Sequence, residues 1–250
     1  MRKPDPARRG TCTYCGKLKP LTVDHVPPKN LFSKPYPPNL WTVPACAACN
    51  GKFSKDDEYF RVALTISDRA KGQTNRDAVL PTVIRGLNKS EARRFRAALL
   101  ANSAVLRRYS SGGLYLGHQR LLSFDGARLD RTAERIIKGL FFKVKGHRLP
   151  DDHTINVVFI GRFRQLMDVD PELDLAVREF LELLGREPLT KIGDAFSFRW
   201  IQSPNGADHS VWSLYFYGNL EFFCTTYALS SIANTTLEAE IARVRTASKF

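Results

Sequence analysis

Four cysteines in two Cys-x-x-Cys pairs constrain this chain more than any other feature. Cys12 and Cys15 form the first pair, and Cys46 and Cys49 form the second about thirty residues later. Two pairs at this spacing match a closed tetrahedral site in which four thiolates hold a structural zinc ion. A module of roughly fifty residues buries too little apolar surface to fold alone, and zinc binding adds on the order of 10 kcal/mol. We therefore expect a compact zinc-bound module near the N-terminus.

The composition around these cysteines favours an intracellular protein. The chain contains no run of about 18 apolar residues, the length that a membrane-spanning helix needs. Its first residues lack the apolar segment of a signal peptide. We expect a cytoplasmic protein of a prokaryote or phage, without membrane association, where reduced thiols favour zinc over disulfides. The fifth cysteine, Cys224, lies in an apolar run and is expected to be a buried core thiol.

Positive charge is concentrated in the first three-fifths of the chain. The net charge is +13, and residues 61–148 contain 19 Lys or Arg against 6 Asp or Glu. Residues 149–250 contain 9 against 14. This asymmetry favours a polyanionic partner, most simply DNA, along residues 1–148. For the acidic C-terminal part we expect a homodimer contact or a protein partner. The alternative is ordinary charge scatter on a soluble surface.

The chain divides into three segments of different composition. We expect a flexible basic arm at 1–10, the zinc module at 11–65, and an α+β accessory domain at 66–250 with a sub-boundary near residue 150. The module is rich in proline, which excludes long helices from most of it. Its pattern predicts a strand at 21–23, a loop, a second strand at 40–43 and a helix from Cys49 onward.

Beyond the module, apolar periodicity predicts helices followed by strands. The predicted helices are an arginine-rich one over 90–108, one capped by Asp130 and ended by Gly146, and one from Asp170 to Gly185. The predicted strands are Ile155–Ile160, Phe196–Ile201, Val211–Tyr217 and Leu220–Tyr227, with a tight hairpin turn at Gly218-Asn219. The fold class expected is α+β: an N-terminal zinc finger, then helices, then an antiparallel β-rich part.

A carboxylate, an imidazole and an amide lie inside the loop that the zinc would close. His25 has the chemistry of a general base, because imidazole titrates near neutral pH. Asp24 and Asn50 offer oxygen ligands, which suit a hard catalytic cation such as Mg²⁺ or Mn²⁺. Neighbouring strand residues point to opposite faces, so Asp24 and His25 share one site only if the strand ends or bends there. Pro27, which follows closely, is consistent with such an ending.

Taken together, these motifs resemble the HNH endonucleases in the four-cysteine version of their ββα-metal finger. The residues that carry the resemblance are Cys12-x2-Cys15, Asp24-His25, Asn39-Leu40 and Cys46-x2-Cys49-Asn50. They cover about residues 10–60. The resemblance implies that Asp24 and His25 act in one site, with His25 as base and Asp24 and Asn50 on the cation. It also implies that Asn39 orders the loop and helps to hold His25. Asn39 precedes Cys46 by seven residues, where about five is common in the family.

The expected function is therefore metal-dependent hydrolysis of phosphodiester bonds in DNA, with a structural Zn(Cys)4 site. One alternative is a non-catalytic, zinc-stabilised protein that binds nucleic acid, which would need basic side chains but no general base. The other is a protein-interaction scaffold, for which salt-sensitive DNA binding should be absent. Asp24 and His25 separate the nuclease from the first alternative, and salt-sensitive DNA binding separates it from the second.

Overall fold

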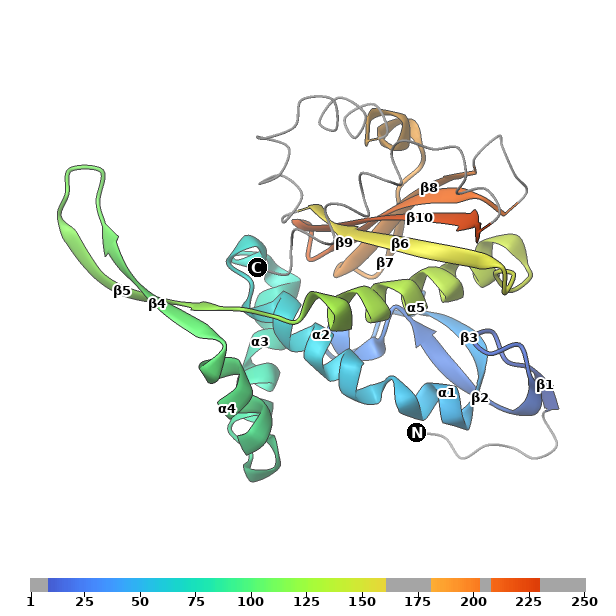
Figure 1. Cartoon of the computed structure of the whole chain (residues 1–250), viewed down its shortest axis with the longest axis horizontal. Helices are drawn as coiled ribbons and strands as arrows, with labels where there is room; N and C mark the ends of the chain where they lie inside the picture. The colour runs from blue at the N-terminus through green and yellow to red at the C-terminus, as the bar shows by residue number, and fades with distance from the viewer. Residues whose placement is uncertain (1–8, 161–180, 203–207, 230–250) are drawn as a thin grey trace.

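The computed structural model describes residues 9–160, 181–202 and 208–229 of the chain. Helices and antiparallel sheets follow one another along these residues (Figure 1), which confirms the predicted α+β class. Within this part of the chain no helix combines the length and the apolar character that crossing a bilayer requires.

The cysteine-containing module folds as a small antiparallel sheet followed by two helices. Its strands are β1 (Arg9–Thr11), β2 (Leu18–Val26) and β3 (Trp41–Cys46), in the order β1-β2-β3. The 3-10 helix η1 (Lys29–Leu31) lies between β2 and β3, and α1 (Ala47–Lys52) and α2 (Ser54–Ile66) follow. This confirms the predicted order of strand, loop, strand and helix. β2 is longer than predicted because its first residues pair with β1 and its last with β3.

The segment after the module ends in a hairpin that the sequence pattern did not predict. It contains η2 (Asp68–Ala70), α3 (Thr74–Leu87), η3 (Ser90–Ala92), α4 (Arg93–Ala101), β4 (Ser103–Tyr109) and β5 (Tyr115–Leu122). The prediction of one helix over 90–108 was wrong beyond Ala101. Arg107 and Arg108 lie on β4, because the Gly112-Gly113 turn lets residues 103–109 pair with β5.

The long helix α5 (Gly126–Lys145) starts earlier than predicted. Its N-cap is Asp125, whose carboxylate accepts hydrogen bonds from the backbone nitrogens of Ala127 and Arg128. Asp130 lies inside the helix, so its assignment as the cap was wrong. The predicted end is confirmed: Gly146 adopts φ 77°, the left-handed conformation that glycine tolerates best.

The C-terminal part is an antiparallel sheet with the strand order β6-β10-β9-β8-β7. The strands are β6 (His153–Phe159), β7 (Thr190–Ile192), β8 (Phe196–Gln202), β9 (Ser210–Phe216) and β10 (Leu220–Ala228). All four predicted strands and the hairpin turn at Gly218-Asn219 are confirmed. The predicted start of a helix at Asp170 lies outside the described residues, and residues 181–186 are helical.

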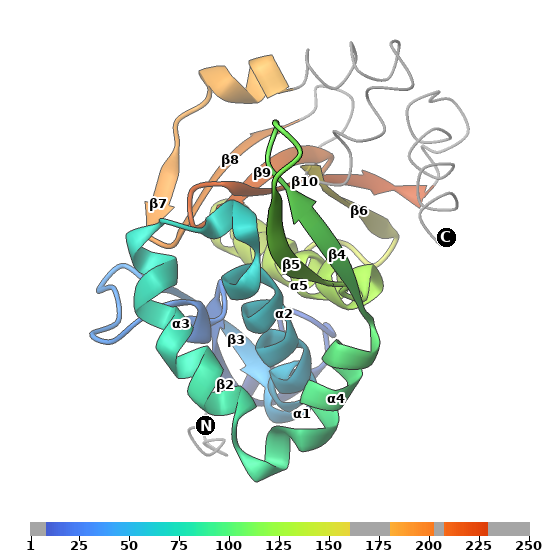
Figure 2. The same ribbon diagram turned by 90° about the vertical axis from the view of Figure 1, so that its left-hand side faces the viewer.

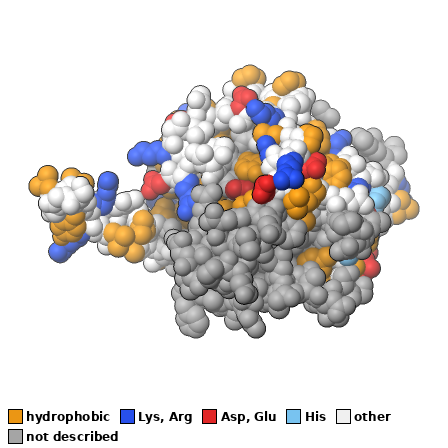
Figure 3. Space-filling model, turned by 90° about the horizontal axis from the view of Figure 1, so that it is seen from above, with side chains coloured by type: hydrophobic (Ala, Val, Ile, Leu, Met, Phe, Trp, Pro, Cys, Tyr) orange, Lys and Arg blue, Asp and Glu red, His pale blue; other side chains and the backbone are white. Residues whose placement is uncertain are grey.

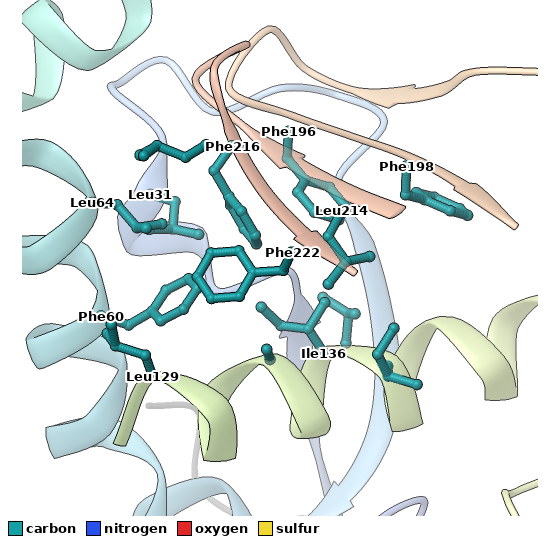
Figure 4. Packing of buried hydrophobic residues seen from close by; sticks show 14 of the residues in the cluster. Leu31, Phe60, Leu64, Leu129, Ile136, Phe196, Phe198, Leu214, Phe216 and Phe222 are labelled. Atoms are coloured by element: carbon teal, nitrogen blue, oxygen red, sulfur yellow. The ribbon is translucent and has the colours of Figure 1, made fainter. Parts of the chain in front are cut away.

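Helix α5 packs between the zinc module and the C-terminal sheet, and one continuous hydrophobic core surrounds it. Phe60 of α2, Ile136 of α5 and Phe222 of β10 meet in this core (Figure 4). Cys224 is fully buried there, as predicted. The domain boundaries expected near residues 65 and 150 stay predictions, while the described core itself runs across both positions.

Candidate functional site

The four paired cysteines converge on one point between the first turn of the module and the start of α1. Their sulfur atoms all lie within 4.8 Å of one another, and no disulfide joins them. The Sγ atoms of Cys15 and Cys46 are 3.9 Å apart. Zn–S bonds of about 2.3 Å in a tetrahedron place sulfurs roughly 3.8 Å apart. The four side chains therefore fit a Zn(Cys)4 site.

The backbone of the first Cys-x-x-Cys turn is shaped for such a site. The nitrogen of Gly16 donates to the carbonyl of Cys12 at 2.9 Å, and Gly16 adopts φ 68°. A Cβ at Gly16 would lie 2.8 Å from Cζ of Arg148. Glycine is favoured at this position for its left-handed conformation, whereas the Arg148 side chain is flexible and its end could move aside for a Cβ.

The electrostatic surroundings favour thiolates at part of the cluster. A hydrogen bond from the backbone of Lys17 lowers the pKa of Cys15 to about 7. The backbone nitrogen of Cys46 donates to Sγ of Cys12 at 3.3 Å. Burial raises the pKa of Cys49, so that thiol favours its protonated form unless a cation is near. A bound zinc ion reverses this preference, because it deprotonates the thiols that ligate it.

Asp24 lies on β2, buried and held by three donors. The phenol of Tyr14 donates to its Oδ2 at 2.6 Å and Nη1 of Arg135 donates to the same oxygen at 2.7 Å. The backbone nitrogen of His25 donates to Oδ1 at 2.9 Å. Arg135, from α5, pairs through Nη2 with Asp57 of α2 as well. Two carboxylates thus share one guanidinium in the interior.

Burial and neighbouring charges shift the pKa values of Asp57, Arg135 and Tyr14. It raises the pKa of Asp57 from an ordinary 3.8 to about 6, although the charge of Arg135 opposes the change. Burial by itself lowers the pKa of Arg135, but Asp57 and Asp24 outweigh it and leave that pKa above its ordinary value. Burial, followed by the charge of Asp24, raises the pKa of Tyr14, which keeps the phenol a donor. We refer to these four side chains as the Arg135 cluster.

His25 follows Asp24 on the same strand but belongs to the other face of the sheet. Pairing between β2 and β3 is regular through Val26, so the strand neither ends nor shifts register at these residues. Thr22, Asp24 and Val26 are buried, whereas Val23 and His25 between them are half-buried. Alternation therefore places Asp24 toward α5 and His25 on the less covered face. The strand continues past both residues before Pro27, so a common site for Asp24 and His25, which the family resemblance implies, stays a prediction.

Asn50 lies on α1, directly after Cys49, and its side chain is fixed against β2. Its Nδ2 donates to the carbonyl of Val23 at 3.2 Å and to Oγ1 of Thr22 at 3.1 Å. Thr22 and Asp24 point to the same face of β2, being two residues apart. Asn50 is therefore on the Asp24 face, and both of these bonds leave its Oδ1 as the atom that can accept a ligand; its role on a cation stays a prediction.

A divalent cation at Asp24 would meet two differently occupied oxygens. Tyr14 and Arg135 donate to Oδ2, whereas Oδ1 accepts one hydrogen bond, from the backbone nitrogen of His25. Among the described residues, only the four cysteines form a converging group of three or more His, Cys, Asp or Glu side chains. Asp24 thus takes part in a buried ion pair, and the Mg²⁺ or Mn²⁺ site expected at Asp24 and Asn50 stays a prediction.

Asn39 connects the loop before β3 to the C-terminal sheet. Its Nδ2 donates to the carbonyl of Lys191 at 3.0 Å, and its Oδ1 accepts from the nitrogen of Gly193 at 3.0 Å. Both ends of the amide are therefore engaged around β7, more than 150 residues away in sequence. The structure gives Asn39 a docking role that the motif did not suggest.

Sequence reasoning missed Arg135 and Tyr14. The sequence did contain a signal for Arg135. This residue lies beside the buried stripe Ala133, Ile136 and Ile137 of α5, although the helix also has exposed positions at which a cation would stay in solvent. Long charged side chains are rarely buried unless paired, so its place beside the stripe indicates a buried partner. Tyr14 lies between the first two cysteines, where no pattern marks it.

Comparisons with known proteins found no relative of this chain. No protein-family model matches the chain, and neither a curated protein nor a solved structure matches it.

Proposed function

We propose that this chain is a zinc-stabilised endonuclease of the HNH type that acts on DNA. The observation that carries the proposal is the module itself: β2, β3 and α1 in ββα order, closed by four converging cysteines, with Asn50 bonded back to the strand of Asp24 and His25. That order of elements and motifs is specific to few zinc modules. The concentration of basic charge in residues 61–148 supports a polyanionic substrate.

The proposed roles follow from position and chemistry. Zinc on the four cysteines is structural and fixes the strand and the helix relative to each other. His25, on the less covered face, takes a proton from the attacking water, and a positioned base of this kind contributes about 10²–10⁴-fold to a rate. Mg²⁺ or Mn²⁺ is the cation that the family resemblance implies, and at Asp24 it would bind Oδ1 or replace Arg135 at Oδ2.

The test is nicking of supercoiled plasmid by the zinc-loaded protein with Mg²⁺ or Mn²⁺ added. His25→Ala should lower the rate by about 100-fold or more, with zinc content and DNA binding retained. The matched control is His147→Ala, an exposed imidazole outside the module that lies 3.4 Å from Asp208. Cleavage by His25→Ala within about tenfold of the wild type contradicts the assigned role.

One observation favours a second candidate, a zinc-stabilised protein that binds nucleic acid without cleaving it. Arg135 holds Asp24 in a buried ion pair, which is a structural use of the carboxylate and not a catalytic one. Under this candidate the wild type shows salt-sensitive DNA binding and no nicking with either metal. A chain that neither binds nor cleaves DNA removes both candidates and leaves the interaction scaffold.

A further inference from the structure

The β4–β5 hairpin projects from the body as an arm (Figure 1) and points toward the viewer in Figure 2. Among the described residues its two strands pair only with each other, and most of its side chains are exposed. The exposed large apolar side chains on it are Val105, Leu106, Tyr109, Leu114, Tyr115, Leu116 and Leu121. A lone two-stranded ribbon is marginally stable in water, and apolar residues gathered on a projecting element mark a surface that is covered by a partner.

The charge of the arm identifies the class of that partner. From residue 92 to residue 124 there is no Asp or Glu, and six arginines lie in the same stretch: Arg93, Arg94, Arg96, Arg107, Arg108 and Arg120. Figure 3 shows basic and apolar side chains together along the projecting hairpin. A second copy of the chain would bring the same positive charges against these, which opposes self-association through the arm. A polyanion complements them.

The two faces of the ribbon differ in a way that fits this assignment. On the inner face Gln119 donates to Oδ2 of Asp68 at 3.1 Å, so this face is turned to the body near η2. Directly opposed residues share a face, and Arg107 opposes His118 while Arg120 opposes Val105. Strand alternation then places Arg107, His118 and Arg120 together on the outer face. Two of the three arginines of the hairpin are therefore on the side that a large ligand can approach, and Arg108 is on the inner face.

The dimensions of the arm match a nucleic-acid groove. Strands of seven and eight residues extend over about 25 Å. Paired strands lie about 4.8 Å apart, and a two-stranded ribbon enters the major groove of B-DNA, which is about 12 Å wide. At the far end the rings of Tyr109 and Tyr115 pair at 5.6 Å between centroids. Arg93 and Arg94, exposed at the foot of the arm on α4, extend the basic surface toward the body.

We propose that residues 103–122 form a DNA-binding arm, whose outer face places Arg107 and Arg120 on phosphates while the ribbon lies in a groove of the duplex. This proposal depends on the proposed function only in naming DNA as the partner. It holds the duplex and takes no part in the chemistry at the zinc module.

The experiment is fluorescence anisotropy with a labelled duplex of about 25 base pairs, titrated at several salt concentrations. Arg107→Gln with Arg120→Gln should raise the Kd by about tenfold or more near 0.1 M salt and lower the salt slope by about two, because two phosphate contacts are lost. The matched control is Arg186→Gln with Lys191→Gln, which removes the same charge from the exposed C-terminal part. It should leave both quantities near the wild-type values.

A second variant removes the arm without opening the body. Ser123 donates its backbone nitrogen to the carbonyl of Asn102 at 2.9 Å, so a short Gly-Ser-Gly linker can replace residues 103–122. This variant should keep its zinc and lose affinity at least as much as the double variant.

Three outcomes overturn the proposal. The first is unchanged affinity and salt slope in the double variant. The second is wild-type affinity in the arm-deleted chain. The third is a wild type that is dimeric by light scattering and becomes monomeric when the arm is removed, which would assign the surface to a second copy. Binding does not require cleavage, so a chain that binds through the arm but never nicks plasmid refutes the nuclease and retains the arm.

Discussion

Replacing Asp57 by asparagine should make the stability of this protein less dependent on pH. Burial raises the folded-state pKa of Asp57, a member of the Arg135 cluster, from an ordinary 3.8 to about 6. A carboxyl with a raised folded pKa binds its proton more tightly in the folded than in the unfolded chain. It therefore adds stability that is complete below about pH 3.8 and is lost as the pH rises through about 6.

The size of the effect follows from the shift. One pKa unit corresponds to about 1.4 kcal/mol, so a change of about two units gives roughly 3 kcal/mol over the whole range. Between about pH 5 and about pH 7.5 the part that is lost is about 1 kcal/mol. Asparagine keeps the shape and can still accept a hydrogen bond from Arg135, but it has no proton to release in this range.

The assay is urea unfolding of zinc-loaded wild type and Asp57→Asn at about pH 5, 6 and 7.5. The free energy of unfolding of the variant, measured relative to the wild type, should rise by about 1 kcal/mol across this window. Cysteine and zinc titration are common to both chains and cancel in the difference. The control is Asp56→Asn, since that neighbouring carboxylate pairs with Arg128 and Arg131 near the surface. A constant difference for Asp57→Asn, or the same trend in the control, refutes the reasoning.

Three other changes test the same structure. Cys46→Ser should lose the zinc and unfold the module, with about one zinc per chain found in the wild type by elemental analysis; a folded, zinc-free wild type contradicts this. Arg135→Ala should lower the free energy of unfolding by about 3–5 kcal/mol in urea at neutral pH, because two carboxylates stay buried without their cation; the exposed Arg131→Ala should change it by less than about 1 kcal/mol. Gly139→Ala should lower the free energy of unfolding by about 1–3 kcal/mol, since a Cβ there clashes with Val26. An unchanged thermal unfolding midpoint would contradict this, because it would show that β2 and α5 can move apart without a cost in stability.

Local patterns predicted the parts of the fold whose cause is local. The spacing of the cysteines predicted their convergence, and the alternation of aromatic and β-branched residues predicted β8, β9 and β10 almost to the residue. The hairpin of β4 and β5 was missed because Val105 and Leu106 also fit the apolar stripe of the preceding helix, and short apolar runs are ambiguous in period. The glycine turn at 112–113 was the signal that decides between the two readings.

The contacts that define the candidate site are not local, and no pattern in one sequence encodes them. Arg135 reaches Asp24 across 111 residues, and Asn39 reaches Lys191 across 152. Each pairing depends on how α5 and the C-terminal sheet pack on the zinc module, and only the folded chain shows that. The motif placed Asp24 correctly on its strand but could not show that a guanidinium from a distant helix would bind it.

The ion pair between Arg135 and Asp24 bears on what the module can do, because Arg135 and Tyr14 occupy Oδ2 and a divalent cation would have to bind Oδ1 or displace Arg135. Arg135 uses Nη1 and Nη2 for its two carboxylates, while its Nε is buried with no hydrogen-bond partner among the described residues. An unsatisfied buried donor costs about 1–3 kcal/mol, so the cluster is held with less than its full hydrogen bonding. Asp57 can keep Arg135 charged and paired after Asp24 is released, which offers a route from the observed ion pair to a free carboxylate beside Asn50. The nuclease proposal requires that exchange or a cation on Oδ1 of Asp24, and the binding-only alternative requires neither.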